Sequence, residues 1–194
     1  MFKKIFILIF MTILLCSCVE TVVVGTVAGG LFIANSNNLN DTETHQKNNS
    51  SNEKEIKKTI KNFFKSEGSE YRNINIKIFE GRILLTGYVK DAKYKKFATD
   101  NVINLYPKNE VIDEITILEA NKKINNFNDY IISQKVSFRM RKIENIKKPN
   151  YKFNVTNSKV IIIGKSNNKE QMNQITNIIS RTKGVDKVIS YIQY

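Results

Sequence analysis

Apolar and polar residues alternate between Ile74 and Val89 in a pattern that predicts a β-hairpin. The first arm, 74–79, alternates isoleucine with polar neighbours, as a strand with one buried face does. Glu80 and Gly81 supply the turn, because glycine accepts the positive φ that a tight hairpin needs. The second arm is apolar on both faces at its centre, which indicates a strand covered on both sides. Gly87 interrupts this arm and indicates a bulge or a close backbone approach.

The same pattern occurs again between Tyr151 and Gly164. The offset is constant at 77 residues, which is the separation of Gly87 from Gly164. At this offset apolar residues match apolar residues, without a gap, over roughly forty positions. The later matches are Ala98 with Ile175, Val102 with Ile179, Val111 with Val188 and Ile115 with Ile192. A period of this length indicates a tandem pair of small domains rather than a solenoid.

Each copy adds two amphipathic helices and a third strand to the hairpin. In the first copy, 54–119, we expect helices over 53–66 and 92–105, the second capped by Asp91, and a strand over 111–118. Ser51 or Asn52 can cap the first of these helices. The positions expected to face the core are Ile56, Ile60, Phe63, Phe64, Phe97, Ala98, Val102 and Leu105.

In the second copy, 127–194, the first helix is expected to start at a cap, Asn128 or Asp129, and to reach about Ile143. Its core stripe consists of Ile132, Val136, Met140 and Ile143. The second helix is expected to be capped by Asn168 and to end at a C-cap, Gly184. The last strand is expected over 188–194. The expected core residues of the second helix are Met172, Ile175, Ile178 and Ile179.

These elements predict an α+β protein with two tandem αββαβ domains. Each domain has about 65 residues, near the lower limit for a self-sufficient core. A three-stranded mixed sheet with two helices packed on one face gives each domain two layers. The other face of each sheet either stays polar and wet or packs against the neighbouring domain.

Residues 1–17 predict a signal peptide, with lysines followed by an apolar run too short to span a bilayer. The run ends in Leu-Cys-Ser-Cys, which resembles a bacterial lipobox. Cys18 fits the lipidated position because the preceding Ser17 is small. Three acyl chains on Cys18 would hold the protein stably on a membrane. An ordinary signal peptide with a chance cysteine and an uncleaved anchor are the alternatives. By resemblance, Val19 after the lipidated cysteine implies the outer membrane rather than the inner.

The segment 18–53 is expected to join this anchor to the domains. Its apolar part, 19–34, is a tether against the bilayer, a segment docked on the domains or a flexible stem. Residues 35–53 are almost wholly polar, which predicts a flexible linker. The only histidine, His45, lies in this linker, where a general base would not be held in place.

The two hairpins, each followed by a helix and a strand, resemble the BON domain family. The residues that carry the resemblance are Ile76, Ile78 and Ile83–Val89 in the first copy, and Val155, Val160–Gly164 and Gly184–Val188 in the second. With the lipobox, the whole set resembles the dual-BON outer-membrane lipoproteins. The resemblance implies a non-enzymatic protein that faces the periplasm, binds phospholipid and supports envelope integrity. Pro107-Lys108 departs from the Gly-Val expected there, so that turn should differ.

The residues give no support for catalysis or for a cofactor. Both cysteines lie at the signal junction, so the mature domains contain no thiol and no Cys/His cluster for a metal. Asp113 and Glu114 form the one adjacent acid pair in a domain. On a strand these side chains point to opposite faces, so they cannot act as a dyad. We therefore expect no catalytic residues, no metal and no cofactor.

The chain carries a formal net charge of +13, and +11 once Lys3 and Lys4 are removed. For an exported protein the available polyanions are anionic phospholipids and lipopolysaccharide, and export argues against nucleic acid. Alternatively, the positive charge reflects only the amino-acid composition, because Ile, Lys and Asn are abundant throughout, as in proteins of AT-rich genomes. The charge alone does not decide between the two.

The first helix of the second copy has a second stripe besides its core. It comprises Ile131, Lys135, Phe138 and Lys142, with Arg139 and Arg141 beside it. Apolar residues with basic neighbours on an outward face are typical of a membrane-surface helix. Ile131, Lys135, Phe138, Arg139 and Lys142 are therefore the candidate lipid-binding residues, unless Ile131 and Phe138 pack on the first domain. A protein-interaction adaptor that docks on envelope proteins is the alternative function.

Overall fold

The computed structural model describes residues 41–118, 124–143 and 150–194 of the 194-residue chain. The predicted signal peptide, Cys18 and the apolar stretch 19–34 lie outside the described residues. Within these three described ranges, no helix is long and apolar enough to cross a membrane.

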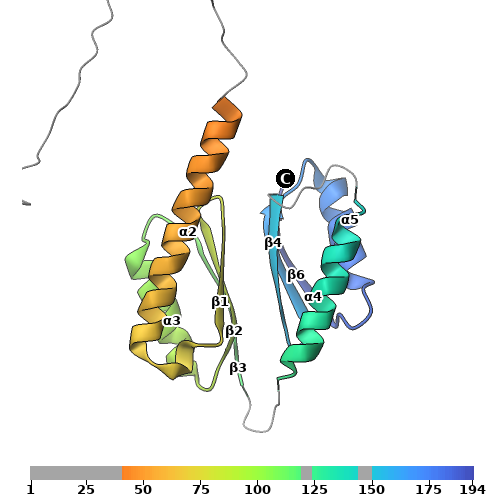
Figure 1. Ribbon diagram of the computed structural model, residues 1–194. Helices are drawn as coiled ribbons and strands as arrows, with labels where there is room; N and C mark the ends of the chain where they lie inside the picture. The colour runs from red at the N-terminus through yellow and green to blue at the C-terminus, as the bar shows by residue number, and fades with distance from the viewer. Residues whose placement is uncertain (1–40, 119–123, 144–149) are drawn as a thin grey trace, which may run out of the picture. The chain divides into compact units, whose positions relative to one another are not determined.

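The first domain is one three-stranded sheet with its helices on one face (Figure 1). Strand β2 is central, antiparallel to β1 and parallel to β3. The elements are α2 (Asp41–Glu67), the 3-10 turn η1 (Ser69–Tyr71), β1 (Ile74–Phe79), β2 (Arg82–Val89), α3 (Ala92–Leu105) and β3 (Val111–Ile117).

The second domain repeats this topology with β5 as its central strand. Its elements are α4 (Asn126–Met140), β4 (Tyr151–Thr156), β5 (Lys159–Lys165), α5 (Lys169–Ser180) and β6 (Lys187–Gln193). The first strands of the two domains begin at Ile74 and Tyr151, at the predicted offset of 77. The predicted α+β fold with two three-stranded mixed sheets is confirmed.

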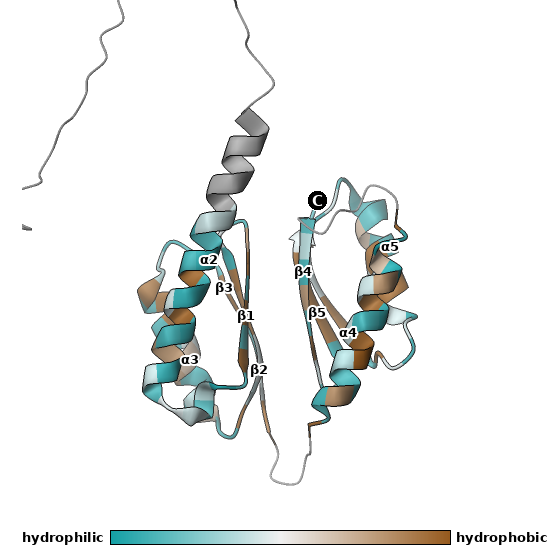
Figure 2. Cartoon of the chain, in the orientation of Figure 1, coloured by the Kyte–Doolittle hydropathy of each residue, from teal (hydrophilic) through white to brown (hydrophobic). Residues whose placement is uncertain are grey.

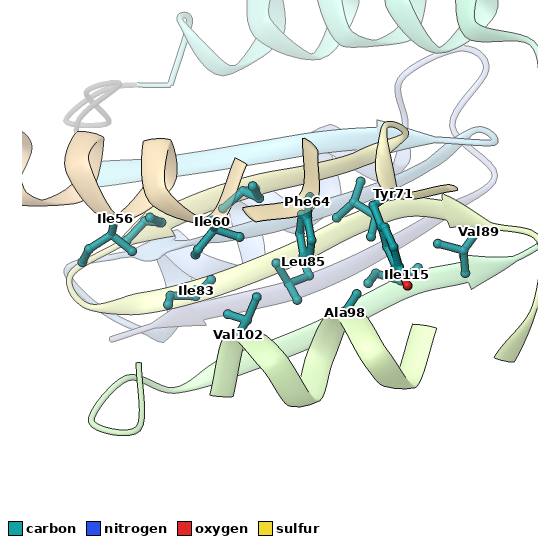
Figure 3. Close-up of a cluster of buried hydrophobic side chains, with 13 residues drawn as sticks. Ile56, Ile60, Phe64, Tyr71, Ile83, Leu85, Val89, Ala98, Val102 and Ile115 are labelled. Atoms are coloured by element: carbon teal, nitrogen blue, oxygen red, sulfur yellow. The ribbon is translucent and has the colours of Figure 1, made fainter. Parts of the chain in front are cut away.

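The cores form where the helices cover the sheets, and apolar residues concentrate on these inner faces (Figure 2). In the first domain Ile60, Leu85 and Val102 are fully buried in one cluster (Figure 3). In the second, Val136 and Ile162 occupy the corresponding cluster. The predicted stripes of α2 and α4 therefore do form the cores.

The glycine in each central strand allows a close backbone approach. A Cβ at Gly87 would lie 2.0 Å from the carbonyl oxygen of Asn73, and one at Gly164 would lie 2.4 Å from that of Asn150. Strand pairing runs through both glycines without an interruption. Of the two alternatives for Gly87, the close approach is the one that occurs.

The sheet faces opposite the helices pack against each other. Leu84 and Ile161, in equivalent strands of the two domains, are fully buried on this face. The cluster comprises Phe79, Leu84, Ile112, Ile161 and Ile163, with Ile189 and Tyr191 packed against it. The second face of each sheet therefore is not wet, and the two domains pack through it.

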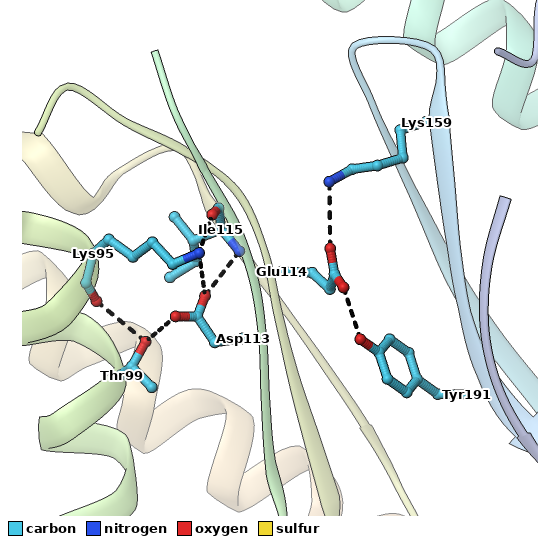
Figure 4. Close-up of polar contacts among 7 residues, drawn as sticks. All are labelled: Lys95, Thr99, Asp113, Glu114, Ile115, Lys159 and Tyr191. Atoms are coloured by element: carbon cyan, nitrogen blue, oxygen red, sulfur yellow. Dashed lines mark hydrogen bonds and ion pairs between the residues drawn. The ribbon is translucent and has the colours of Figure 1, made fainter. Parts of the chain in front are cut away.

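A polar network borders this apolar cluster (Figure 4). The Glu114 carboxylate accepts a hydrogen bond from the Tyr191 hydroxyl at 2.7 Å and lies 3.3 Å from the Lys159 ammonium. Arg82 donates to the backbone carbonyl of Tyr191 at 2.8 Å and pairs with Glu110 at 2.9 Å. Burial first, then the hydrogen bond and negative charge of Glu114, raise the pKa of Tyr191 to about 12.

Helix α2 is longer than predicted, because it begins at Asp41 instead of Glu53. The flexible-linker prediction is therefore wrong for 41–53, and Ser51 and Asn52 lie inside the helix rather than capping it. This segment contains neither glycine nor proline, so polar residues continue the helix beyond its apolar stripe. His45 belongs to this helical segment.

Three smaller expectations are also wrong. Helix α5 ends at Ser180, and Gly184 lies in the following turn with φ +98, rather than capping the helix. Leu105 and Phe97 were expected to face the core. Leu105 is instead 44% exposed, and Phe97 is 36% exposed although its ring stacks on that of Phe63.

Candidate functional site

Helix α4 has one face in the core and one face directed outward. Ile132, Val136 and Met140 recur every four residues and are fully buried. The side chain of Asn125 caps the helix by accepting the backbone N–H of Asn128 at 3.0 Å. Because these three residues face the core, residues about half a turn away around the helix face outward.

Asp129, predicted as a possible cap, has a different role. Its buried carboxylate accepts the backbone N–H groups of Asn157 and Ser158 at 2.7 and 2.8 Å. These two residues form the β4–β5 turn, and both have positive φ without being glycine. Asp129 therefore fixes α4 against the turn and supports a backbone conformation that costs energy for side-chain-bearing residues.

Helix α4 exposes three aromatic rings. Phe127 is 74% exposed, and Tyr130 and Phe138 are each 59% exposed. Phe127 and Phe138 are separated by eleven residues, which is close to three helical turns, so they share one side of the helix. Tyr130 lies about 60° around the helix from Phe127 and lines a hollow with Asn75, Gly87 and Tyr88 of the first domain. Phe127 and Phe138 therefore form the exposed aromatic pair of the outward face, and such exposed rings are typical of a surface that contacts another molecule.

The predicted lipid-binding residues surround these rings. Lys135, Phe138, Arg139 and Lys142 are exposed, and Ile131 is half-buried at the edge of the face. The Lys142 ammonium lies 4.6 Å from the centroid of the Phe138 ring, a cation–π contact. Arg139 donates to the carbonyl of Arg181 at 3.0 Å. The structure thus brings the five residues to one side of α4, and lipid binding by them stays a prediction.

The alternative in which Ile131 and Phe138 pack on the first domain is wrong for Phe138, whose side chain is 59% exposed. The cluster that joins the domains is built from the sheets and contains no residue of α4. Instead, Lys135, Phe138 and Arg139 border a shallow hollow that Thr182 and Lys183 complete from the turn after α5. Lys183 therefore adds a positive charge that the sequence pattern did not associate with this helix.

Phe127 and Tyr130 were not predicted as site residues. The expected cap at Asn128 or Asp129 placed Phe127 outside the helix. The sequence did contain a pattern that could have identified Phe127, because Phe127, Ile131 and Phe138 are spaced at i, i+4 and i+11. A helix start two residues earlier would have extended the predicted stripe to Phe127.

Nothing in the described residues indicates catalysis. Asp113 contacts Thr99 at 2.9 Å and Lys95 at 3.5 Å on the helix side of the sheet, whereas Glu114 points to the other domain (Figure 4). The prediction that they cannot act as a dyad is therefore confirmed. Within the described ranges, no group of three or more His, Cys, Asp or Glu residues could hold a metal ion.

The described residues form a tandem pair of small αββαβ domains. A family model described as the BON domain matches residues 52–119 and 128–194. The chain therefore belongs to the BON domain family, which is not an enzyme family.

Two further comparisons give more distant similarity. An Anaplasma centrale protein described as an uncharacterized protein in the gshII 5′ region is 30% identical over 125 residues, or 63% of this chain and 82% of that protein. Two structures of CdsD, a structural protein of the type III secretion system of Chlamydia trachomatis, match 72% of this chain at 13% and 14% identity, each with a TM-score of 0.29. The matches span 65% and 61% of those chains, which is less than two thirds of their length.

Proposed function

We propose that the protein is a membrane-anchored lipoprotein that binds anionic phospholipid through the outward face of α4. It would be a dual-BON lipoprotein of the DolP (YraP) type, facing the periplasm and supporting outer-membrane integrity. In this role it acts by adhesion, without turnover and without a cofactor.

The observation that carries the proposal is the combination of exposed rings and cations on α4. Phe127 and Phe138 present apolar area outward, and Lys135 and Lys142 lie on the same side. Aromatic rings suit the boundary between head groups and acyl chains. Each lysine near an anionic membrane surface contributes about 1 kcal/mol of attraction. The face therefore favours membranes that contain anionic lipid.

Lipid anchoring is a separate part of the proposal. Cys18 would carry the acyl chains, and Val19 after it supports sorting to the outer membrane. Mass spectrometry of protein extracted from membranes should find an acylated amino-terminal Cys18. A Cys18→Ser chain should leave the membrane fraction, and a chain without acyl groups at this residue would contradict the anchor.

Vesicle flotation tests the α4 face directly. The unlipidated chain, carrying Cys18→Ser, is mixed with neutral vesicles or with vesicles containing phosphatidylglycerol. We expect recovery with the anionic vesicles only, and loss of that recovery in the double variant Phe138→Ala, Lys135→Glu. The matched control is Leu105→Ala, Lys108→Glu, which also removes one exposed apolar side chain and reverses one exposed lysine. Equal recovery with both vesicle types would reject the proposal.

The alternative is an adaptor that binds an envelope protein through the same face. Exposed aromatic residues support it, because aromatic side chains are enriched in protein interfaces. Crosslinking in cells through a photoreactive residue at Phe127 distinguishes the two. A single stoichiometric protein adduct would favour the adaptor, whereas adducts with lipid would favour the membrane.

A further inference from the structure

The first domain carries a hollow that lies away from α4. It has a volume of about 620 Å³ and is bounded by the last two turns of α2, the η1 turn and strand β1. Its apolar wall consists of Phe64, Tyr71, Ile74 and Ile76. These residues belong to the first core, so the hollow is held in shape by packed side chains.

Three cations surround this apolar wall. Lys61, Lys65 and Arg72 line the hollow and are exposed. Within the described part of the chain, none of them forms an ion pair. Burial first, then Tyr94, Glu67 and Glu70, raise the pKa of Tyr71. Neither glutamate lines the hollow, although the Glu70 carboxylate lies beside the lining residue Gly68. The lining itself therefore carries only positive charge.

We propose that this hollow binds one single-chain anionic amphiphile, such as a fatty acid. The hydrocarbon chain would lie along Phe64, Tyr71, Ile74 and Ile76, and the acidic head would contact Lys61, Lys65 or Arg72. The volume is in the range of sites for one small ligand, which suits a single chain. An anionic head is favoured because it neutralises cations that the protein leaves without partners, whereas a neutral head would not.

This site is independent of the α4 face, since no residue of α4 lines it. The two proposals can therefore fail separately. If lipid binding by α4 is wrong, the hollow in the first domain keeps both its apolar wall and its cations.

Isothermal titration calorimetry with dodecanoate, below its micelle-forming concentration, tests the proposal on the unlipidated Cys18→Ser chain. Dodecyl maltoside is the control with the same chain length and a neutral head. We expect saturable binding of dodecanoate and much weaker binding of the maltoside. Lys65→Glu with Arg72→Glu should weaken dodecanoate binding about tenfold or more.

Two further variants make the test specific. Lys54→Glu with Lys58→Glu changes the net charge of the chain by the same amount, at exposed positions of α2 outside the hollow, and should alter affinity by less than about twofold. Asn62→Trp fills the hollow without changing charge and should abolish binding. Asn62 is exposed, so this replacement leaves the core unchanged, and thermal unfolding of every variant verifies the fold.

Several outcomes would overturn the proposal. These are no saturable binding of dodecanoate, equal binding of the neutral amphiphile, equal weakening by the Lys54→Glu, Lys58→Glu control, and unchanged binding in Asn62→Trp. Loss of binding in the Phe138→Ala, Lys135→Glu variant would assign the amphiphile to α4 instead.

Discussion

Helices α2 and α4 occupy equivalent places in the two domains but expose different side chains. Each buries a stripe spaced at four residues, such as Ile60 in α2 and Val136 in α4. Outside, α2 presents lysines, while its Phe63 and Phe64 turn toward the domain interior. On α4 the aromatic rings point outward instead. The lysines exposed along α2 are Lys54, Lys57, Lys58, Lys61 and Lys65.

This difference separates what the fold requires from what it leaves free. Both copies keep the core positions, the hairpin and the tight glycine because αββαβ packing depends on them. The outward helix faces do not contribute to packing, so they are free to diverge. The widely exposed rings of α4 have no counterpart on α2, and this difference supports the proposal that the second copy carries the lipid-binding face.

The largest expected effects test whether the two cores are equivalent. Leu85 and Ile162 are related by the 77-residue offset, and both are fully buried. Leu85→Ala and Ile162→Ala should each lower the free energy of unfolding by about 2–5 kcal/mol, because each leaves a cavity. Denaturant unfolding followed by circular dichroism measures both. If either variant kept wild-type stability, the equivalence of the cores would be wrong.

The glycine pair should show a smaller and unequal loss. Gly87→Ala and Gly164→Ala each force a methyl group against a backbone carbonyl, at a cost of about 1–3 kcal/mol. Only Gly87 has a positive φ, of +101, so its variant should lose about 1 kcal/mol more. The same unfolding experiment compares them, and a larger loss for Gly164→Ala would contradict this account.

The contact between the domains should depend on Glu114. Glu114→Ala leaves Lys159 and the Tyr191 hydroxyl without their partner and should cost about 1–3 kcal/mol of stability. The control is Asp100→Ala, which breaks the more exposed Lys96–Asp100 pair and should cost about 0.5 kcal/mol or less. Equal losses would show that Glu114 contributes no more than a surface pair.

Alkaline pH should weaken the same contact through Tyr191. Its folded-state pKa is about 12, above the ordinary 10.0, so the folded chain holds this proton more tightly than the unfolded chain. The resulting stability is fully present below pH 10 and is lost as pH rises through about 12. Unfolding measured across this range should show a shallower decline for Tyr191→Phe than for wild type. Parallel curves would contradict the role of Tyr191.

The smallest stability effects belong to the exposed helix faces. Phe127→Ala and Leu105→Ala should each change the free energy of unfolding by about 0.5 kcal/mol or less, because both side chains are largely outside the core. The two should differ in function, since only Phe127→Ala should reduce recovery with anionic vesicles. Equal recovery for the two variants would exclude Phe127 from the contact face.

The sequence predicted the domains where apolar spacing determines them. The hairpins, the central strands and the core stripes follow directly from alternation and from i, i+4 spacing. The start of α2 at Asp41 was missed because residues 41–52 are all polar, so the sequence there has no apolar period to detect. The contact between Asp129 and the β4–β5 turn was missed because it joins residues far apart in the sequence, and a favourable cap residue gave a simpler local explanation.

Part of the candidate site was also predicted, because its residues follow helical spacing. Phe138 and its basic neighbours lie in a clear second stripe, so their outward position could be inferred from helical geometry. Phe127 depended on where the helix starts, which is the least certain feature of such a pattern. Tyr130 lay inside the predicted helix but outside the Ile131, Lys135, Phe138 and Lys142 stripe, so the pattern did not select it. Lys183 comes from another element, and only tertiary structure brings it near α4.

Because the two sheets share one apolar cluster, each domain depends on the other to cover one face of its sheet. Cut apart, each half would expose to water a side it now conceals, including Leu84 in one fragment and Ile161 in the other. Such fragments would tend to aggregate or to pair with foreign surfaces. A single excised half would therefore present an adhesive face that the intact molecule covers.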